Sequence, residues 1–285
     1  MTAVPVVRAA FVDEMDSRRT DLLTSGGSRT RSVCGRNFAV AVTELRADDD
    51  LVEHDLPDEY MLLLPDEVTV VVTHDSGQIV TVTEPSLLIV PAGNSVVRAE
   101  AATTIVRVFA AHADEPMRRA TNYTAQHDPA VAPLLTRPRS DTAPIQVHRM
   151  SDVPNDPGRL GRIFRSTSLM VNWFPTRVGP RDTEALTPHS HADFEQMSVT
   201  LQGDFVHHFR SPWTPRMSEW RDDEHVGVGS PSIVLIPPNL VHTTRWVGEG
   251  DHMLIDVFAP PREDFLAKGW VLNADGYRAV PDDRR

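Results

Sequence analysis

The chain has 285 residues, which is long enough for one large domain or for two domains of ordinary size, each with its own hydrophobic core. Hydrophobic residues make up 40% and charged residues 24%, an average usage that excludes wholesale disorder and a fibrous fold. The formal net charge of -12 argues against a nucleic-acid or anionic-membrane partner, because both would need a concentrated basic face.

The N-terminal segment carries no signal-peptide core, because Arg8, Asp13 and Asp16 interrupt its apolar residues. No later run approaches the roughly 18 consecutive apolar residues of a membrane helix. The single cysteine, Cys34, cannot form an intrachain disulfide, and no cysteine-hydrolase signature surrounds it. We therefore expect a cytoplasmic protein with no membrane partner and an inert thiol.

Short runs rich in Val, Ile and Leu, bounded by Gly or Pro, predict a mainly β chain. Helical periodicity is limited to residues 11–24 and 114–127. In chain order, strands are expected in "NFAVAVTEL", "EVTVVVTH" and "QIVTVTE", and then in "SLMVNWF", "MSVTLQ" and "DFVHHF". Many short strands favour an all-β sandwich or barrel over a parallel α/β sheet.

The chain contains an internal repeat. Residues 85–96 read "PSLLIVPAGNSV" and residues 231–242 read "PSIVLIPPNLVH". Each match is followed by a second one, "IVRVFA" at 105–110 and "LIDVFA" at 254–259. Two matches in the same order predict a duplicated β unit.

A proline-rich segment, residues 129–157, separates the two copies and predicts an extended connector without regular structure. We place the boundary near 145, giving domains 1–145 and 146–285. The second copy has an insertion at 211–229, where the first has only "HDSG". This enlarged hairpin loop with two tryptophans is interpreted as a rim or lid.

A pair of histidines two residues apart marks the candidate site. On a strand, His189 and His191 would face the same side with Cα atoms about 7 Å apart, so both imidazoles could bind one ion. The next strand, "MSVTLQ", returns a third ligand beside them, and His242, after the proline turn "IPPNLV", supplies a fourth. Imidazoles with one oxygen donor suit Fe(II), Mn, Ni, Cu or Zn.

These residues resemble the two motifs of the cupin superfamily. "HSHADFEQMSVTLQG" has the form HxH, three or four residues, Glu, six residues, Gly, and "PPNLVH" resembles the second motif with Asn239 in the glycine position. The resemblance implies an all-β bicupin, two antiparallel jelly-roll β-barrels of cupin type with a few short helices. Residues 1–145 would form a degenerate barrel with the linker, and residues 146–285 a metal-binding barrel.

Two residues compete for the glutamate position of the first motif. Counting six residues back from Gly203 selects Gln196, whereas Glu195 leaves seven. Strand parity favours Glu195, which shares with Met197 and Val199 a face that looks like a barrel lining. We favour Gln196 as the ligand beside His189, His191 and His242, with Glu195 as a nearby catalytic base.

The N-terminal copy is a poorer match. His54 and Glu59 are present, but Leu56 stands in place of the second histidine and Val96 in place of the last. A single histidine and a single carboxylate bind an ion weakly, so this half is predicted to be metal-free and structural.

Further aromatic and basic residues flank the motifs. The default role of each tryptophan is packing, although an aromatic wall would suit a planar substrate. An arginine that faces inward could clamp a carboxylate. The arginines considered are Arg165, Arg210 and Arg245.

The resemblance implies a metal-dependent enzyme, with an Fe(II) dioxygenase acting on a small organic acid or phenolic compound as the first hypothesis. One divalent transition metal per chain is expected, and Fe(II) is favoured. A neutral ligand set leaves the full charge on the metal, which favours an anionic bidentate substrate. The alternatives are a cupin isomerase, lyase, cyclase or hydrolase that uses the metal as a Lewis acid, and a non-catalytic ligand-binding bicupin. The resemblance also suggests a homodimer.

Overall fold

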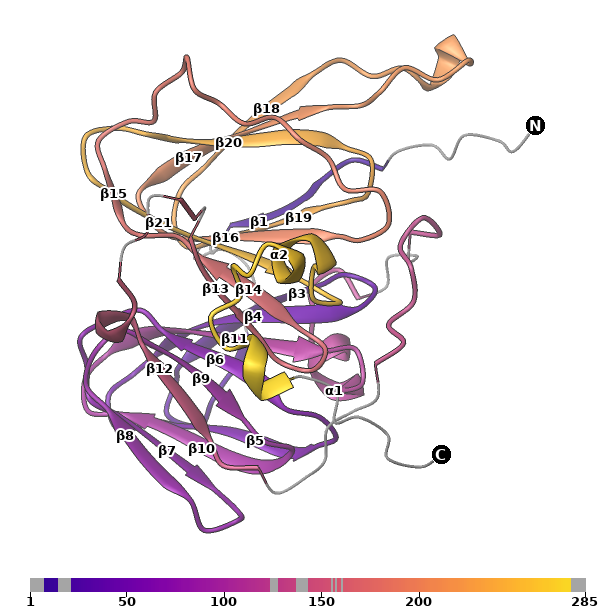
Figure 1. The fold of residues 1–285 in the computed structure, drawn as a ribbon. Coiled ribbons are helices and arrows are strands. Elements are labelled where there is room, and N and C mark those ends of the chain that lie inside the picture. Colours follow the sequence, from indigo (N-terminus) through magenta and orange to yellow (C-terminus); the bar gives the residue numbers. More distant parts are fainter. Residues whose placement is uncertain are drawn as a thin grey trace.

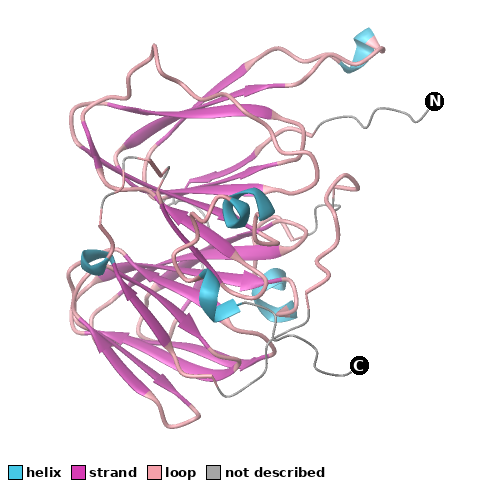
Figure 2. Ribbon diagram, in the orientation of Figure 1, coloured by secondary structure: helices cyan, strands magenta, loops and turns pink. Residues whose placement is uncertain are grey.

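A computed structural model of the chain describes residues 8–14, 22–123, 128–136, 143–154, 156, 158–159 and 161–277. Strands dominate these residues, and the helical segments are short (Figure 2). The α-helices are α1 (Asp114–Arg118) and α2 (Glu263–Ala267), and the 3-10 turns are η1 (Met150–Asp152), η2 (Met217–Glu219) and η3 (Ala274–Tyr277). No helix in this part of the chain has the length and apolar character needed to cross a membrane.

The N-terminal barrel consists of two antiparallel sheets. The large sheet has the order β12-β9-β6-β11-β4-β3-β2 and the small sheet the order β5-β10-β7-β8. The strands of the large sheet are β2 (Leu22–Leu23), β3 (Arg29–Cys34), β4 (Phe38–Leu45), β6 (Tyr60–Leu64), β9 (Ser86–Val90), β11 (Thr103–Ala110) and β12 (Gln146–Arg149). Those of the small sheet are β5 (Asp50–Leu56), β7 (Val70–His74), β8 (Ile79–Val82) and β10 (Gly93–Ala99).

The C-terminal barrel repeats this arrangement. Its large sheet has the order β1-β19-β16-β21-β14-β13, with β15 also paired to β21, and its small sheet has the order β18-β17-β20. The strands of the large sheet are β1 (Phe11–Glu14), β13 (Arg162–Arg165), β14 (Met170–Trp173), β15 (Arg177–Val178), β16 (Gln196–Gln202), β19 (Ser232–Ile236) and β21 (Asp251–Phe258). Those of the small sheet are β17 (Asp204–Arg210), β18 (Glu224–Val228) and β20 (Val241–Val247).

The two barrels exchange an edge strand. β1, from the start of the chain, pairs with β19 of the C-terminal barrel, and β12, which follows residue 145, pairs with β9 of the N-terminal barrel. The repeat makes the exchange reciprocal, because β9 and β19 are the two copies of one strand. The domain division at 145 remains a prediction. Strand pairing links the two sides of this position twice, because β1 precedes it and pairs in the second barrel, whereas β12 follows it and pairs in the first.

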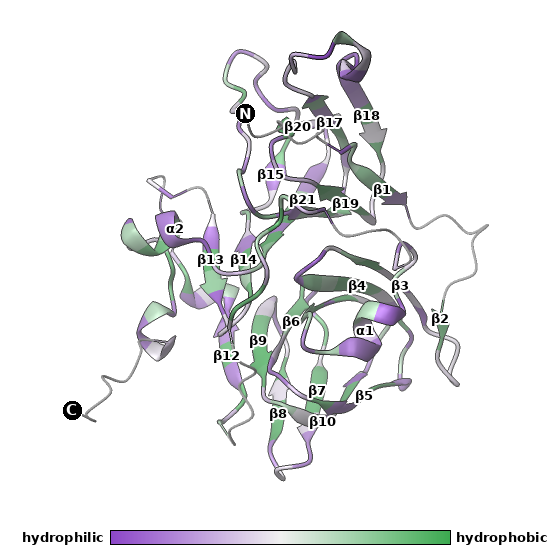
Figure 3. Cartoon of the chain, turned by 90° about the vertical axis from the view of Figure 1, so that its right-hand side faces the viewer, coloured by the Kyte–Doolittle hydropathy of each residue, from purple (hydrophilic) through white to green (hydrophobic). Residues whose placement is uncertain are grey.

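The large sheets of the two barrels pack face to face. In Figure 1 the indigo and magenta barrel lies below the orange one, and the core between them draws side chains from both. Val40 and Val108 of the first half share this core with Met197, Val199 and residues of β21. The strands β4 and β9 are strongly hydrophobic in Figure 3, as expected for a sheet buried on both faces.

The expected strands are present, but the helix expected at 11–24 is wrong where the structure describes it. Phe11–Glu14 is β1 and Leu22–Leu23 is β2, and residues 15–21 lie outside the described residues. Pairing with β19 decides this conformation, and local periodicity cannot show such a long-range partner. Of the helix expected at 114–127, the structure contains α1 at Asp114–Arg118. The connector also contains β12, which the proline count did not predict.

Within the insertion at 211–229, residues 211–223 form an arm that projects from the C-terminal barrel beyond the ends of β17 and β18, and residues 224–228 are β18 itself (Figure 1). Trp213 and Trp220 stack on one another there, with ring centroids 4.8 Å apart. Neither ring lines the pocket described below, so the structure gives this arm no rim or lid position.

Candidate metal centre

Three histidines from two distant segments meet in the C-terminal barrel. His189 and His191 lie in the loop before β16, and His242 is the second residue of β20. Their ligand atoms all lie within 4.8 Å of one another. The His189 N–H donates to the His242 carbonyl at 3.0 Å, and the His242 N–H donates to the His189 carbonyl at 2.8 Å. His189 and His191 were expected to lie on a strand, and the structure has only this isolated bridge at His189.

The turn before β20 holds His242 next to His191. Asn239 in this turn has a left-handed backbone with φ 64°. Its N–H donates to the His191 carbonyl at 2.6 Å, and its side-chain amide donates to the Ala192 carbonyl at 3.3 Å. Asparagine adopts this conformation more readily than most other non-glycine residues. Asn239 can therefore replace the glycine of the second cupin motif.

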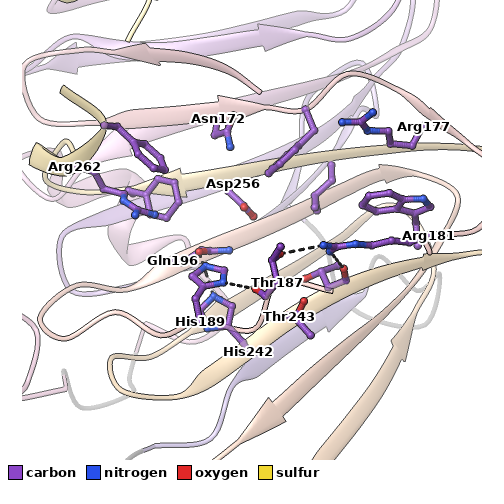
Figure 4. Close-up of a pocket in the computed structure, with 16 residues that line it drawn as sticks. Asn172, Arg177, Arg181, Thr187, His189, Gln196, His242, Thr243, Asp256 and Arg262 are labelled. Carbon is purple, nitrogen blue, oxygen red and sulfur yellow. Dashed lines mark hydrogen bonds between the residues drawn. The ribbon is translucent and has the colours of Figure 1, made fainter. Parts of the chain in front are cut away.

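Gln196, the first residue of β16, lies against the histidines. Its Oε1 is 3.0 Å from His191 Nε2 and 3.4 Å from His242 Nε2. Only 2% of the residue is exposed, and Figure 4 shows its amide directed toward the imidazoles. The structure thus brings the three histidines of the motifs together with Gln196, the residue favoured by the spacing from Gly203.

Glu195 points the other way, into the interface between the barrels. The Arg36 N–H donates to its Oε2 at 2.6 Å, and a Cβ at Gly35 would collide with its carboxylate. Met197 and Val199 belong to the core shared by both barrels. Strand parity predicted that this apolar face lines the barrel. That prediction is wrong, because the face packs on the other barrel. A role of Glu195 as base remains a prediction that its position does not favour.

Burial keeps two of the site histidines, His191 and His242, neutral. It lowers the pKa of His191 to about 3 and that of His242 to about 4. His242 Nδ1 lies 2.9 Å from the Leu240 carbonyl, and His189 Nδ1 lies 2.9 Å from the Thr187 carbonyl. A carbonyl oxygen only accepts, so each Nδ1 carries a proton, and the Nε2 of neutral His242 keeps its lone pair. A neutral imidazole with its Nε2 lone pair available is the form that binds a transition metal ion.

A cavity of about 190 Å³ opens beside this cluster (Figure 4). His189, Gln196 and His242 form part of its wall. A second part is apolar and mostly aromatic, and consists of Phe174, Trp246, Leu254, Phe258 and Phe265. Such a pocket suits a small molecule with an apolar body and a polar end that contacts the cluster.

The remaining charges of the pocket are mainly positive. Arg177, Arg181 and Arg262 line it, and Asp256 is the one acidic residue among the lining residues. Arg181 is fixed by a 2.6 Å hydrogen bond to the Thr244 carbonyl. Arg262 is paired with a carboxylate of α2, whereas Arg177 is exposed. This excess of guanidinium groups favours an anionic ligand.

Asp256 is linked to Gln196 through one hydroxyl group. The Ser198 hydroxyl donates to Asp256 Oδ1 at 2.6 Å, and Gln196 Nε2 donates to Ser198 Oγ at 3.1 Å. Burial raises the pKa of Asp256 to about 6, although the bond from Ser198 acts in the opposite direction. Asn172 lies beside Asp256 on the neighbouring strand β14.

Asp256 lies outside both cupin motifs and was not predicted as a site residue, yet the repeat contains a signal for it. Asp256 interrupts the apolar run "LIDVFA" where Arg107 interrupts "IVRVFA". In the N-terminal barrel, Arg107 forms a buried ion pair with Glu53. A charge at the same place in both copies indicates a position that faces a barrel interior.

Other residues considered from sequence lie elsewhere. Arg165 stacks on Tyr277 at 5.3 Å, and Arg210 pairs with Asp223 at 2.5 Å. Neither these two arginines nor Arg245 lines the pocket, whereas Trp246 does. Cys34 is buried, and burial raises the pKa of its thiol to about 11, in keeping with an inert side chain.

The N-terminal barrel does not bring its motif residues together. His54 is exposed, whereas the Glu59 carboxylate accepts hydrogen bonds from the Thr167 N–H at 2.7 Å and the Thr167 hydroxyl at 2.9 Å. Register places Tyr60 and Leu62 at the positions that Gln196 and Ser198 occupy in the other barrel. Within the described ranges, the three histidines of the C-terminal barrel form the one cluster of three such ligands.

No protein-family model matches the chain, and no curated protein matches it in sequence. Solved structures are similar in fold. The oxalate decarboxylase of Lactobacillus farciminis, in a formate complex, is 14% identical with a TM-score of 0.60, over 92% of this chain and 89% of that chain. A variant of the Bacillus subtilis oxalate decarboxylase is 13% identical with a TM-score of 0.59, over 99% and 89% of the two chains. AerE from Microcystis aeruginosa is 8% identical with a TM-score of 0.54, over 90% and 99%.

The comparisons and the sheet order together define the fold. The chain has the bicupin fold, with two antiparallel β-barrels, as its motifs predicted. Identities of 14% and below establish the fold and leave the activity open.

Proposed function

We propose that this protein is a metal-dependent enzyme that acts on a small organic acid. The observation that carries the proposal is the convergence of three imidazoles and one amide oxygen beside a largely apolar pocket. A neutral ligand set leaves the full charge of a bound divalent ion available to an anion. The arginines of the pocket add positive charge beside it.

When bound at this cluster, a divalent metal would supply Lewis-acid activation or a site for oxygen chemistry. The protein residues would position the substrate. Arg177 and Arg181 are placed to orient an anionic group, and the aromatic wall with Trp246 and Phe258 would exclude water from its apolar part. Asp256, as the acid of the pocket, would accept or return a proton.

The similar folds widen the choice of metal. The Bacillus subtilis oxalate decarboxylase, with a TM-score of 0.52 and 12% identity in one of its structures, contains Mn(II) centres. Mn(II) therefore stands beside Fe(II), the ion favoured from the sequence, as the first metal to test. One ion per chain is proposed, since the described residues contain a single cluster of three histidines.

Two reaction classes remain as proposals. The dioxygenase predicted from the family resemblance would consume oxygen. A decarboxylase or other lyase is the second candidate, because Asp256 offers a carboxylate for proton transfer and oxalate decarboxylases share the fold. Oxygen uptake during turnover of catechols, hydroxy acids and dicarboxylates separates the classes: turnover without oxygen consumption rejects the dioxygenase. Binding of these compounds without turnover would favour a ligand-binding bicupin.

The metal site can be tested without knowing the substrate. After reconstitution with Mn(II) or Fe(II) and desalting, the wild-type protein is expected to hold about one ion per chain by elemental analysis. His189→Ala and His242→Ala should each lose most of this metal, because each removes one of four donors. His225→Ala, at an exposed histidine outside the cluster, is the matched control. A metal content well below one ion per chain in the wild type, with every ion tried, would contradict the proposal.

Variants of Gln196 and Glu195 test which of these two neighbours is a metal ligand. Gln196→Ala is expected to weaken Mn(II) affinity at least tenfold, whereas Glu195→Ala should change it less than about twofold, because Glu195 faces the inter-barrel interface. Isothermal titration of both variants measures the difference. A larger loss in Glu195→Ala would reverse the assignment. Sedimentation velocity would test the homodimer, which stays a prediction.

A further inference from the structure

The side-chain amide of Gln196 ends in an oxygen and a nitrogen, and only the oxygen can coordinate a metal ion. Its Oε1 carries lone pairs, whereas its Nε2 has two N–H bonds and none to offer a cation. A carboxylate at the same position would present an oxygen in either orientation. With glutamine at residue 196, the affinity of the site for a metal depends on which way the amide is turned.

Hydrogen-bond direction determines that orientation. The Asp256 carboxylate can only accept, so the 2.6 Å contact with Ser198 uses the one hydroxyl proton of Ser198. Ser198 Oγ must then accept from its other neighbour, the Gln196 amide group at 3.1 Å. That partner must be Nε2. The remaining end, Oε1, therefore faces His191 and His242.

Burial limits the groups that could replace these hydrogen bonds, and the Asp256 carboxylate is a second acceptor that interacts with the Gln196 amide. Gln196 is 2% exposed and Ser198 is fully buried. Loss of the Ser198 hydroxyl would remove the 3.1 Å acceptor of this buried amide donor and leave it only the interaction with Asp256, which favours a rotation that finds a better acceptor. The acceptor at the opposite end would be an imidazole nitrogen of the cluster. A turned amide would then direct N–H bonds at the place where the metal needs a lone pair.

We propose that Ser198 and Asp256 are positioning residues that fix the amide of Gln196 with its oxygen toward the metal site. The proposal rests on the metal site proposed above and adds a requirement that a glutamate-containing site would not have. The other barrel agrees with it: where Tyr60 replaces the glutamine, the Ser198 position is Leu62 and the Asp256 position is Arg107. Those residues cannot form the same chain of donors and acceptors.

A double-mutant cycle tests the proposal through metal affinity. Ser198→Ala is made in the wild-type chain and in a Gln196→Glu chain, and the Kd for Mn(II) is measured by titration calorimetry and by the loss of the free Mn(II) EPR signal. In the wild-type chain the Kd should rise about tenfold or more. In the Gln196→Glu chain it should rise less than about twofold, because a carboxylate needs no orienting donor.

A third variant addresses the far end of the hydrogen-bond chain. Asp256→Asn introduces an amide that can donate to Ser198, which lets the hydroxyl turn and donate to Gln196 Oε1. This reversal should raise the Kd for Mn(II) several-fold in the wild-type chain and much less in the Gln196→Glu chain. Thr200→Val is the matched control, since it removes a buried hydroxyl two residues along β16 that bonds to Ser232 and the Gly229 carbonyl. Its Kd should match that of the wild type.

The outcomes separate the two proposals. If the wild type binds Mn(II) and Ser198→Ala raises the Kd by the same factor in both chains, or by none, the orientation proposal is overturned and the metal site stands. If the wild type binds no metal, both are overturned. The side-chain amide signals of Gln196 in ¹⁵N-glutamine-labelled, metal-free protein give a second readout. Ser198→Ala should shift them strongly and Thr200→Val should not, and unchanged signals in Ser198→Ala would contradict the proposal.

Discussion

At the scale of single residues, the alternation of side chains at the start of β16 gives the neighbours Glu195 and Gln196 different surroundings. Gln196 faces the interior of its own barrel and contacts the histidines, whereas Glu195 faces the partner barrel at Arg36. Burial raises the pKa of Glu195 to about 7 there. One step along the chain therefore decides whether a side chain belongs to the metal site or to the inter-barrel interface.

His207 is a buried histidine outside the cluster. It is fully buried, its Nδ1 lies 2.9 Å from Thr244 Oγ1, and its Nε2 has no hydrogen-bond partner among the described residues. Burial lowers its pKa from 6.5 to about 4, and nearby His242 acts in the same direction. The unfolded chain therefore binds a proton at a higher pH than the folded chain does, so stability is lost as the pH falls from about 6.5 toward 4.

We expect His207→Gln to reduce this acid sensitivity. Between pH 7.5 and pH 5 the variant should lose about 2 kcal/mol less unfolding free energy than the wild type, because one buried titration is removed. Urea unfolding at both pH values gives the difference. His54→Gln, at an exposed histidine of the N-terminal barrel, should behave as the wild type. Equal losses in the wild type and His207→Gln would show that His207 does not titrate in this way.

At the scale of elements, a buried charge pair attaches the exchanged strand β1 to the N-terminal barrel. Asp13 Oδ1 lies 3.1 Å from Arg31 Nη1, and the Thr121 hydroxyl donates to Asp13 Oδ2 at 2.6 Å. Arg31 also donates to the Glu14 carbonyl at 2.6 Å. The backbone of β1 thus pairs with β19 in the C-terminal barrel, while the Asp13 side chain is bound by residues of the N-terminal half.

Asp13→Ala should destabilise the protein by about 3 kcal/mol, because it removes a buried carboxylate that pairs with the buried Arg31 guanidinium. Replacing both partners, Asp13→Leu with Arg31→Met, should recover much of the loss. Asp222→Ala, at an exposed aspartate on the arm, is the control. Chemical denaturation measures all three, and a loss below about 1 kcal/mol in Asp13→Ala would contradict a structural role for the pair.

At the scale of the whole molecule, the two barrels share one hydrophobic core and complete each other's sheets. The face of each large sheet that would be exposed in an isolated barrel is buried against the other sheet. The edge strands β1 and β12 each belong to the sheet of the opposite half. Neither half can bury its apolar surface alone.

The chain should therefore unfold in a single cooperative transition. In scanning calorimetry the van't Hoff enthalpy should equal the calorimetric enthalpy. Fragments 1–145 and 146–285 expressed separately should be aggregated or unfolded, and their co-expression should restore a folded complex. Two resolved transitions, or a folded 146–285 fragment that unfolds cooperatively, would show that the barrels are independent.

Much of the fold was predictable because local patterns are repeated. The copies of "PSLLIV" and "LIDVFA" predicted paired β units, and the proline turns placed the ends of their strands. The edge strands were not predictable, because β1 and β12 are short and take their conformation from partners more than 55 residues away. The same limit produced the wrong helix at residues 11–24.

The sequence by itself determined the duplicated β framework and the spacing of His189, His191 and His242, and it favoured Gln196 over Glu195 by the distance from Gly203. These follow from patterns along the chain. Tertiary structure alone decided which face of β16 lines the pocket, because an apolar face can pack on its own barrel or on a neighbour. It also brought Ser198, Asp256 and the arginines to the site, since their proximity to the histidines depends on how the strands pair.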